Sequence, residues 1–191
     1  MDAIEAILGR RTVPQAVMRE PGPNPDELTK ILACGEAAPD HGQLRPWRIL
    51  VVEGDDRRLL GRYMRDAAAT LFPDAPASEL DKAAARPLRA PLLLVVIASL
   101  DPNHPKIPRD EQLAAASAAA QNMLIAVHAL GYAGKWSPGK DAAAPEIRAA
   151  FDLGEHDQIL GFLYVGRADE AVRPPARNGV DVTVRRWPTR V

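Results

Sequence analysis

Cysteine is almost absent from the chain, and its single cysteine, Cys34, excludes an internal disulfide and any metal site built from several cysteines. Cys34 stands among apolar residues in a helical pattern, which favours a small core residue over a reactive thiol. Histidine is also scarce, and His41, His104, His128 and His156 are scattered without the spacing of metal ligands. His128 falls in an apolar helical run, which is typical of a structural histidine. The sequence therefore predicts no metal site.

The common catalytic motifs are missing as well. The chain contains no G-x-G-x-x-G, no P-loop, no G-x-S-x-G elbow and no H-E-x-x-H. The usual covalent and metal-dependent mechanisms thus have no visible side chains to carry them. If the protein is an enzyme, a bound cofactor is expected to supply the chemistry.

An excess of positive charge and a long apolar run are absent too. The formal net charge is -1, which disfavours a nucleic-acid partner. No window reaches the roughly 18 uncharged apolar residues of a membrane span. The acidic residues Asp2 and Glu5 stand where a secretory signal would have a cationic leader. We expect a cytoplasmic protein without nucleic-acid or membrane partners.

What the sequence does contain is an alternation of helical and strand-like patterns, which predicts one domain with a layered mix of sheet and helix. The near-continuous apolar run at 90–99 predicts a central strand covered on both faces. Asn24 followed by Pro25 and Glu27 predicts a capped helix start. Helices are expected over 2–10, from Asn24, over 55–71, from a capping box at Ser78, over 109–130 and over 141–153, and strands over 47–54, 90–99 and 158–166.

The end of the chain has a different composition. Residues 167–191 are rich in proline and arginine and contain one strand-like fragment, "VDVTV". This tail cannot fold alone, so it is either disordered or packed on another surface such as a partner subunit. A solvated tail is favoured over phosphate or partner contacts for its arginines Arg173, Arg177, Arg185 and Arg186. We expect a single domain over 1–191 with this tail extended.

Three polar patches could carry function. Arg10, Arg11 and Thr12 follow the apolar pattern of the first helix, where they could be a solvated helix end or a seat for a phosphate. A polar loop at 40–45 stands between a helix and a buried strand. The glycine-bracketed segment "GYAGKWSPG" at 131–139 could point backbone N–H groups at a ligand beside an aromatic side chain. From these residues alone, the patches could equally be a solvated helix end, a helix-ending turn and a segment with a core aromatic residue.

In chain order the motifs are Arg10-Arg11-Thr12, "APDH" at 38–41 with Pro46-Trp47, "HPKIP" at 104–108, Gly131 to Trp136, and "ILGFLYVG" at 159–166. Together they resemble the FMN-dependent nitroreductase family, in particular its small single-domain (YdjA-type) branch. The resemblance covers about residues 1–167. It implies an α+β nitroreductase-like sandwich, with a mixed or antiparallel sheet flanked by helices, and a homodimer that binds FMN at its interface.

The resemblance also implies site residues. Arg10, Arg11 and Thr12 would hold the phosphate and ribityl groups of FMN. His41 would reach the flavin, plausibly from the other subunit, and Ala37 stands where the branch can carry an arginine that does so. The segment Gly134, Lys135 and Trp136 would lie against the flavin ring. Gln15, Gln43 and Arg45 depart from the residues that are commoner at their positions.

The implied activity is that of an NAD(P)H-dependent oxidoreductase. It would reduce nitro compounds, quinones or a similar small acceptor by ping-pong hydride transfer, with the flavin rather than a catalytic side chain carrying the electrons. The alternatives are specialised flavin chemistry on the same fold, such as dehalogenation or flavin fragmentation, and a flavin-binding dimer without turnover. An alanine- and arginine-rich interaction module without flavin is a further reading from the composition.

Overall fold

A computed structural model of the chain describes residues 1–168, 184 and 187. Nearly all of the predicted tail, including Arg173, Arg177, Arg185 and Arg186, therefore lies outside the described residues. Arg167 and Ala168, which were assigned to the tail, are the last residues of a strand. The expectation that the tail is solvated or packs on a partner stays a prediction.

The described residues form a five-stranded sheet around one long strand, β5 (Asp157–Ala168). Residues 162–165 of β5 pair with β3 (Leu92–Ser99) and also with β4 (Ala133–Ser137), so β3 and β4 flank β5 on opposite sides. The remaining strands are β2 (Trp47–Glu53), which pairs with β3, and β1 (Met18–Arg19), which pairs with the end of β5. These pairings are antiparallel, as the predicted fold class allows.

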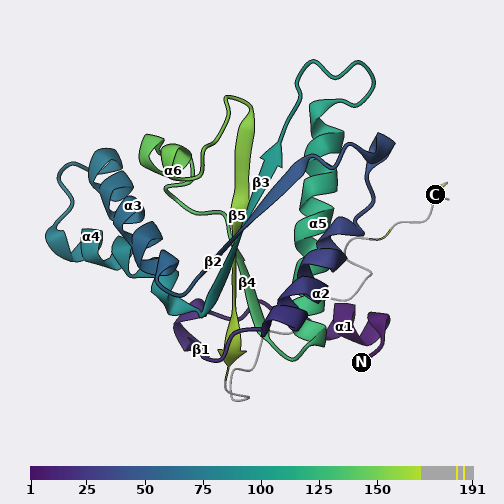
Figure 1. Cartoon of the computed structure of the whole chain (residues 1–191), viewed down its shortest axis with the longest axis horizontal. Coiled ribbons are helices and arrows are strands. Elements are labelled where there is room, and N and C mark those ends of the chain that lie inside the picture. Colours follow the sequence, from purple (N-terminus) through teal and green to yellow (C-terminus); the bar gives the residue numbers. More distant parts are fainter. Residues whose placement is uncertain (169–183, 185–186, 188–191) are drawn as a thin grey trace.

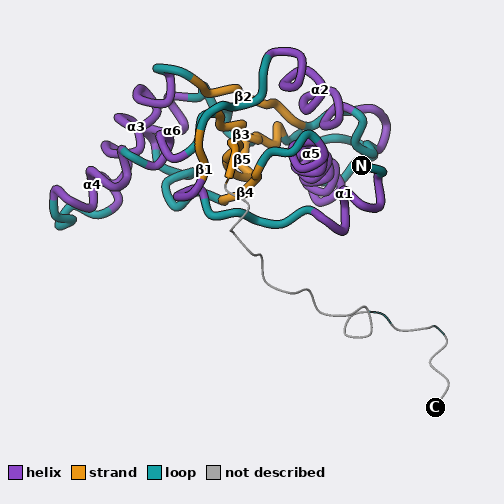
Figure 2. Tube along the Cα trace, turned by 90° about the horizontal axis from the view of Figure 1, so that it is seen from below, coloured by secondary structure: helices purple, strands orange, loops and turns teal. Residues whose placement is uncertain are grey.

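Helices cover both faces of the sheet, as Figures 1 and 2 show. Leu93, Val95 and Ile97 of β3 face one apolar cluster, which includes residues of α3 (Asp56–Leu71) and α6 (Pro145–Ala150). The alternate residues of β3 pack toward α2 (Pro25–Glu36) and α5 (Arg109–Ala129). Because β3 is buried on both faces, the prediction from its continuous apolar run is confirmed.

Two of the predicted helix boundaries are wrong. The helix α4 (Ala77–Ala84) begins after Pro76, and Ser78 makes no capping hydrogen bond. The helix predicted over 141–153 is the short α6, because Asp141–Ala144 form a turn and Pro145 takes the first helical position. The capping boxes of Asp2 with Glu5 and of Asn24 with Glu27 are present.

One expectation about burial also fails. Cys34 is exposed, because α2 turns Ile31 and Gly35 toward α5 and leaves Cys34 on its outer side. In α1 (Ala3–Gly9) only Ala6 is buried, and the apolar stripe that includes Ile4 and Leu8 lies on the surface, with those two residues 69% and 60% exposed. Within the described ranges, no helix is long and apolar enough to cross a membrane.

Candidate functional site

The strand β4 connects two of the patches singled out in the sequence. Thr12 forms a parallel bridge with Gly134, and the backbone N–H of Val13 donates to the Gly134 carbonyl at 3.1 Å. Gly134 lets this edge lie close to α5, since a Cβ there would be 3.0 Å from the Leu124 side chain. The fold therefore places the Arg10–Thr12 segment beside Gly134, Lys135 and Trp136.

Two arginines form a positive corner at the first end of β4. Arg10 caps the C-terminus of α1, and Arg11 folds back so that its guanidinium donates to the carbonyls of Leu8 and Arg10. Both arginines are half-buried, and Thr12 is exposed. Burial, and then the positive charges of Arg10 and Arg11, lower the pKa of His128 on α5 below its ordinary value. The corner thus brings two positively charged side chains next to the start of β4.

A cavity of about 210 Å³ lies past the other end of β4. Its wall comes from the segment before β1, from α3 and the 3-10 helix Arg86–Arg89, from β5, and from the loop that joins β4 to α6. The residues that line it are Gln15, Met64, Arg86, Arg89, Ser137, Gly139, Lys140, Asp141, Ala142, Ile147, Phe162 and Tyr164.

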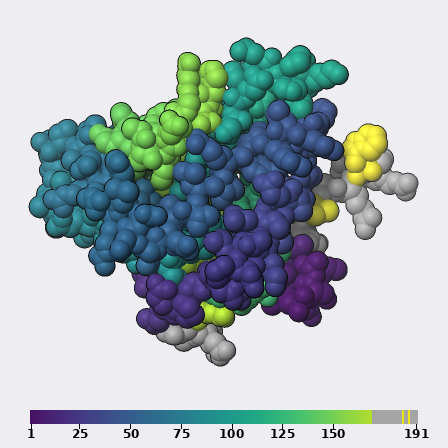
Figure 3. Space-filling view, viewed as in Figure 1, coloured from purple at the N-terminus to yellow at the C-terminus, as the bar shows by residue number. Residues whose placement is uncertain are grey.

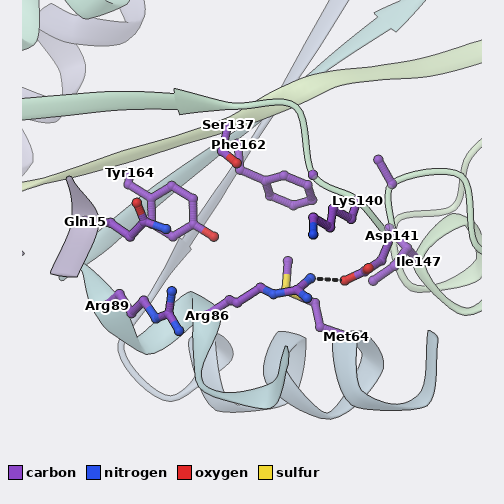
Figure 4. Close-up of a pocket in the computed structure, with 12 residues that line it drawn as sticks. Gln15, Met64, Arg86, Arg89, Ser137, Lys140, Asp141, Ile147, Phe162 and Tyr164 are labelled. Atoms are coloured by element: carbon purple, nitrogen blue, oxygen red, sulfur yellow. Dashed lines mark hydrogen bonds and ion pairs between the residues drawn. The ribbon is translucent and has the colours of Figure 1, made fainter. Parts of the chain in front are cut away.

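Some charged residues of this cavity form ion pairs with one another and others do not. Asp141 is 3% exposed and pairs through Oδ2 with Arg86, while its buried Oδ1 has no hydrogen-bond partner among residues 1–168, 184 and 187. Arg89 and Lys140 form no ion pair within the described part of the chain. Figure 4 shows the Arg86–Asp141 pair on one side of the cavity, with the Tyr164 hydroxyl pointing into it. Burial is the main cause that raises the pKa of the Tyr164 phenol.

Sequence reasoning missed most of this cavity. A signal was present, since "ARPLRAP" sets two arginines before a buried strand and "GKD" sets a lysine and an aspartate after a turn. Only the tertiary structure shows that these segments face each other. The side chain of Lys135 on β4 donates through Nζ to Oε1 of Gln15 and so connects this strand to the cavity wall.

The indole of Trp136 is committed to the core rather than to the cavity. Its Nε1 donates to the Leu160 carbonyl at 2.9 Å. The ring lies directly on Gly161, where a Cβ would come within 2.3 Å of the indole nitrogen. Strand alternation then directs Ser137 toward the cavity, which it lines. Contact between residues 134–136 and a flavin ring stays a prediction. Because the Trp136 side chain faces the core, the backbone of this segment would make that contact.

The structure does not bring His41 or Ala37 to this site within one chain. His41 Nδ1 lies 2.7 Å from Oε2 of Glu111, at the start of α5, and Ala37 is the exposed C-cap of α2. The positive corner adjoins His128 at the other end of α5. From Glu111 to His128, α5 advances by about 25 Å at its rise per residue. One chain therefore supplies the site residues in two separate places.

Comparison with known proteins identifies the family to which this chain belongs. The sequence model described as "Nitroreductase family" matches residues 7–167. The chain belongs to the nitroreductase family. This membership identifies the protein as an oxidoreductase and confirms the resemblance drawn from the sequence motifs.

Relatives of this nitroreductase-family protein resemble it over most of their length. YdjA of Escherichia coli K12, named as a candidate NAD(P)H nitroreductase, is 39% identical over 87% of this chain and 88% of its own. A solved nitroreductase-like protein from Bacillus cereus has 25% identity and a TM-score of 0.81, covering 98% of this chain and 97% of its own. A Bacteroides fragilis nitroreductase, solved with bound FMN, has 21% identity and a TM-score of 0.70, covering 97% and 98%.

Proposed function

We propose that this protein is an FMN-dependent NAD(P)H oxidoreductase that reduces nitro compounds, quinones or a similar small acceptor by ping-pong hydride transfer. The observation that carries the proposal is the Thr12–Gly134 bridge, which places the two arginines of the positive corner beside β4, the strand that leads to the cavity. Family membership and the names of the relatives, an NAD(P)H nitroreductase and an FMN-bound structure, support it.

The residues at the corner fit the phosphate of FMN. The phosphate of FMN carries a charge of about −2, and this charge must be neutralised where the group is partly buried. Arg10 and Arg11 offer guanidinium donors, and Thr12 adds a hydroxyl. Charge-assisted hydrogen bonds of this kind contribute roughly 1.5–3 kcal/mol each.

The cavity side fits a ring that is apolar on its faces and polar at its edge. Phe162 and Met64 provide apolar surface, and Arg86 and Tyr164 provide donors. Within the described residues, Oδ1 of Asp141 has no hydrogen-bond partner, which leaves an acceptor in this wall for a bound ligand. When bound, FMN would accept a hydride from the reduced nicotinamide and pass it to the acceptor. The chain then has to bind, orient and shield, and it needs no catalytic side chain.

Two copies of the chain would complete the site. The cavity is smaller than the roughly 300–1,000 Å³ of typical ligand pockets. The exposed apolar residues of α1 adjoin α5, which carries apolar residues all around its axis. Antiparallel packing of two α5 helices about a two-fold axis would bring Ala37 and His41 of each chain to the positive corner of the other. We therefore propose a homodimer in which both chains contact each flavin.

The visible spectrum of the purified protein tests the proposal. We expect flavin absorption that bleaches when NADPH or NADH is added without oxygen and returns when a nitroaromatic compound is added. Colourless protein that gains no flavin on incubation with FMN would contradict it. Bound flavin that nicotinamides do not reduce would instead indicate a flavin-binding dimer without turnover. The cytoplasmic location stays a prediction.

A further inference from the structure

The cavity past β4 carries more positive charge than a structural role requires. Among the described residues that line it, the three cations Arg86, Arg89 and Lys140 face the single carboxylate of Asp141. The Arg86–Asp141 pair is close to neutral as a unit, and its buried carboxylate fixes the guanidinium in place. The surplus charge is therefore that of Arg89 and Lys140.

The acidic residue Glu79, which also lies near Lys140, does not cancel this surplus. Glu79 on α4 lies close enough to Lys140 for the charge of Lys140 to lower its pKa. However, Glu79 already accepts from Lys82 at 2.6 Å, so that pair is neutral as well. Arg89 and Lys140 are both exposed and keep access to solvent at the cavity mouth.

The rest of the wall limits what can occupy the cavity. Met64, Ile147 and Phe162 form an apolar floor, and the Tyr164 hydroxyl and the Gln15 amide add donors. With the flavin ring on this floor, as proposed above, Arg89 and Lys140 at the mouth complement an anionic group on a second molecule that stacks against the ring. The phosphate of FMN already has a seat at the other end of β4, so a second anion must come from another molecule.

We propose that Arg89 and Lys140 bind a carboxylate or phosphate group of the molecule that exchanges electrons with the flavin, so that the enzyme selects anionic substrates. This inference rests on the proposed function and specifies its substrate class. The anionic group can belong to the acceptor or, as the extra phosphate of NADPH, to the donor. In both cases Arg86, held by Asp141, lines the cavity as a fixed third cation.

The experiment compares matched substrates in the full-length holoprotein. 4-Nitrobenzoate and 4-nitrobenzamide differ in charge at nearly equal shape, and NADPH differs from NADH by one phosphate. In an Arg89→Gln/Lys140→Gln double variant, we expect the charged-to-neutral ratio of kcat/KM to fall about tenfold for one of these pairs. The ratio of the unaltered protein should also fall with rising salt concentration. An Arg62→Gln/Lys106→Gln variant removes two exposed cations elsewhere and should keep the ratio.

Direct binding separates this inference from the proposed function. Calorimetric titration of 4-nitrobenzoate and 4-nitrobenzamide, and of NADP⁺ and NAD⁺, needs no turnover. We expect the charged member of one pair to bind more tightly, and the double variant to lose that difference. Equal binding within both pairs would overturn the inference even if the protein reduces nitro compounds. Weaker FMN binding by the double variant, with both ratios unchanged, would overturn it too.

Discussion

At the scale of single residues, the Arg10–Thr12 segment is held in place by contacts that its local sequence does not reveal. Two guanidiniums at the end of a helix are compatible with simple solvation. Here Arg11 is tied to the carbonyls of α1, and Thr12 is bridged to Gly134. This fixed arrangement lowers the entropy cost of holding an anion, because little of the backbone has to be ordered on binding.

Replacement of Arg10 by alanine is expected to yield a folded protein with little or no bound flavin. The substitution removes one of the two charges assigned to the proposed phosphate site, and we expect it to lower FMN affinity about tenfold or more. The flavin content per chain, measured from the visible spectrum, checks this, with circular dichroism as the test of folding. Arg58→Ala on the exposed side of α3 is the matched control. A normal yellow Arg10→Ala protein would show that the phosphate binds elsewhere.

The lowered pKa of His128 predicts that the free energy of unfolding depends on pH. Its pKa is lowered in the folded protein, so the unfolded chain binds a proton more readily as the pH falls below the ordinary histidine value of about 6.5. His128 thus destabilises the apoprotein in this acidic range, and its effect disappears above it. Urea unfolding of the apoprotein at pH 7.5 and 5.5 should show a smaller acid loss for His128→Asn than for the unaltered chain. An equal loss in both proteins would remove His128 as a cause.

At the scale of elements, the path from β4 to α6 shapes the cavity. Gly139 has φ +76°, and a Cβ there would lie 2.5 Å from the Phe162 ring. The turn can therefore press onto β5 only with a glycine at this position, which directs Lys140 and Asp141 into the cavity wall.

We expect Gly139→Ala to be more destabilising than Gly54→Ala. Both glycines have positive φ, but a Cβ at Gly54 would meet nothing within 4 Å. The control thus carries only the backbone penalty of about 1–2 kcal/mol, and Gly139→Ala adds an overpacking cost of about 1–3 kcal/mol. Denaturant unfolding of the two variants measures the difference. Equal stabilities would mean that the loop relaxes away from Phe162.

At the scale of the whole molecule, α1 leaves apolar side chains on the surface. In the space-filling view of Figure 3, α1 lies at the edge of the molecule. Among the described residues, Ile4 and Leu8 of its apolar stripe are exposed. A second copy that covers α1 and α5 would bury this surface, as the proposed dimer requires.

Leu8→Glu is therefore expected to weaken the dimer and reduce flavin content together. A charge placed in an apolar interface is destabilising unless it is paired. Size-exclusion chromatography with light scattering gives the mass, and the visible spectrum gives the flavin. Leu71→Glu, at an exposed apolar position on α3, should leave both unchanged. A dimeric, fully flavinated Leu8→Glu protein would place the interface elsewhere.

The sequence by itself determined the elements with strong local signals. The apolar run of β3, the capped start of α2 and the long α5 follow from hydrophobic pattern and capping chemistry, which act over a few residues. The ordered motifs were sufficient to indicate the family. Burial could not be read with the same success, because the stripe of α1 and Cys34 both lie in apolar patterns that a single chain leaves exposed.

Only the tertiary structure decided which polar residues meet. Arg86 and Asp141 are 55 residues apart, and Thr12 and Gly134 are joined across most of the chain. Such contacts depend on how strands pair and helices pack, and local periodicity carries no information about them. The same physics explains why His41 was grouped with the site in sequence but lies at the opposite end of α5 in one chain.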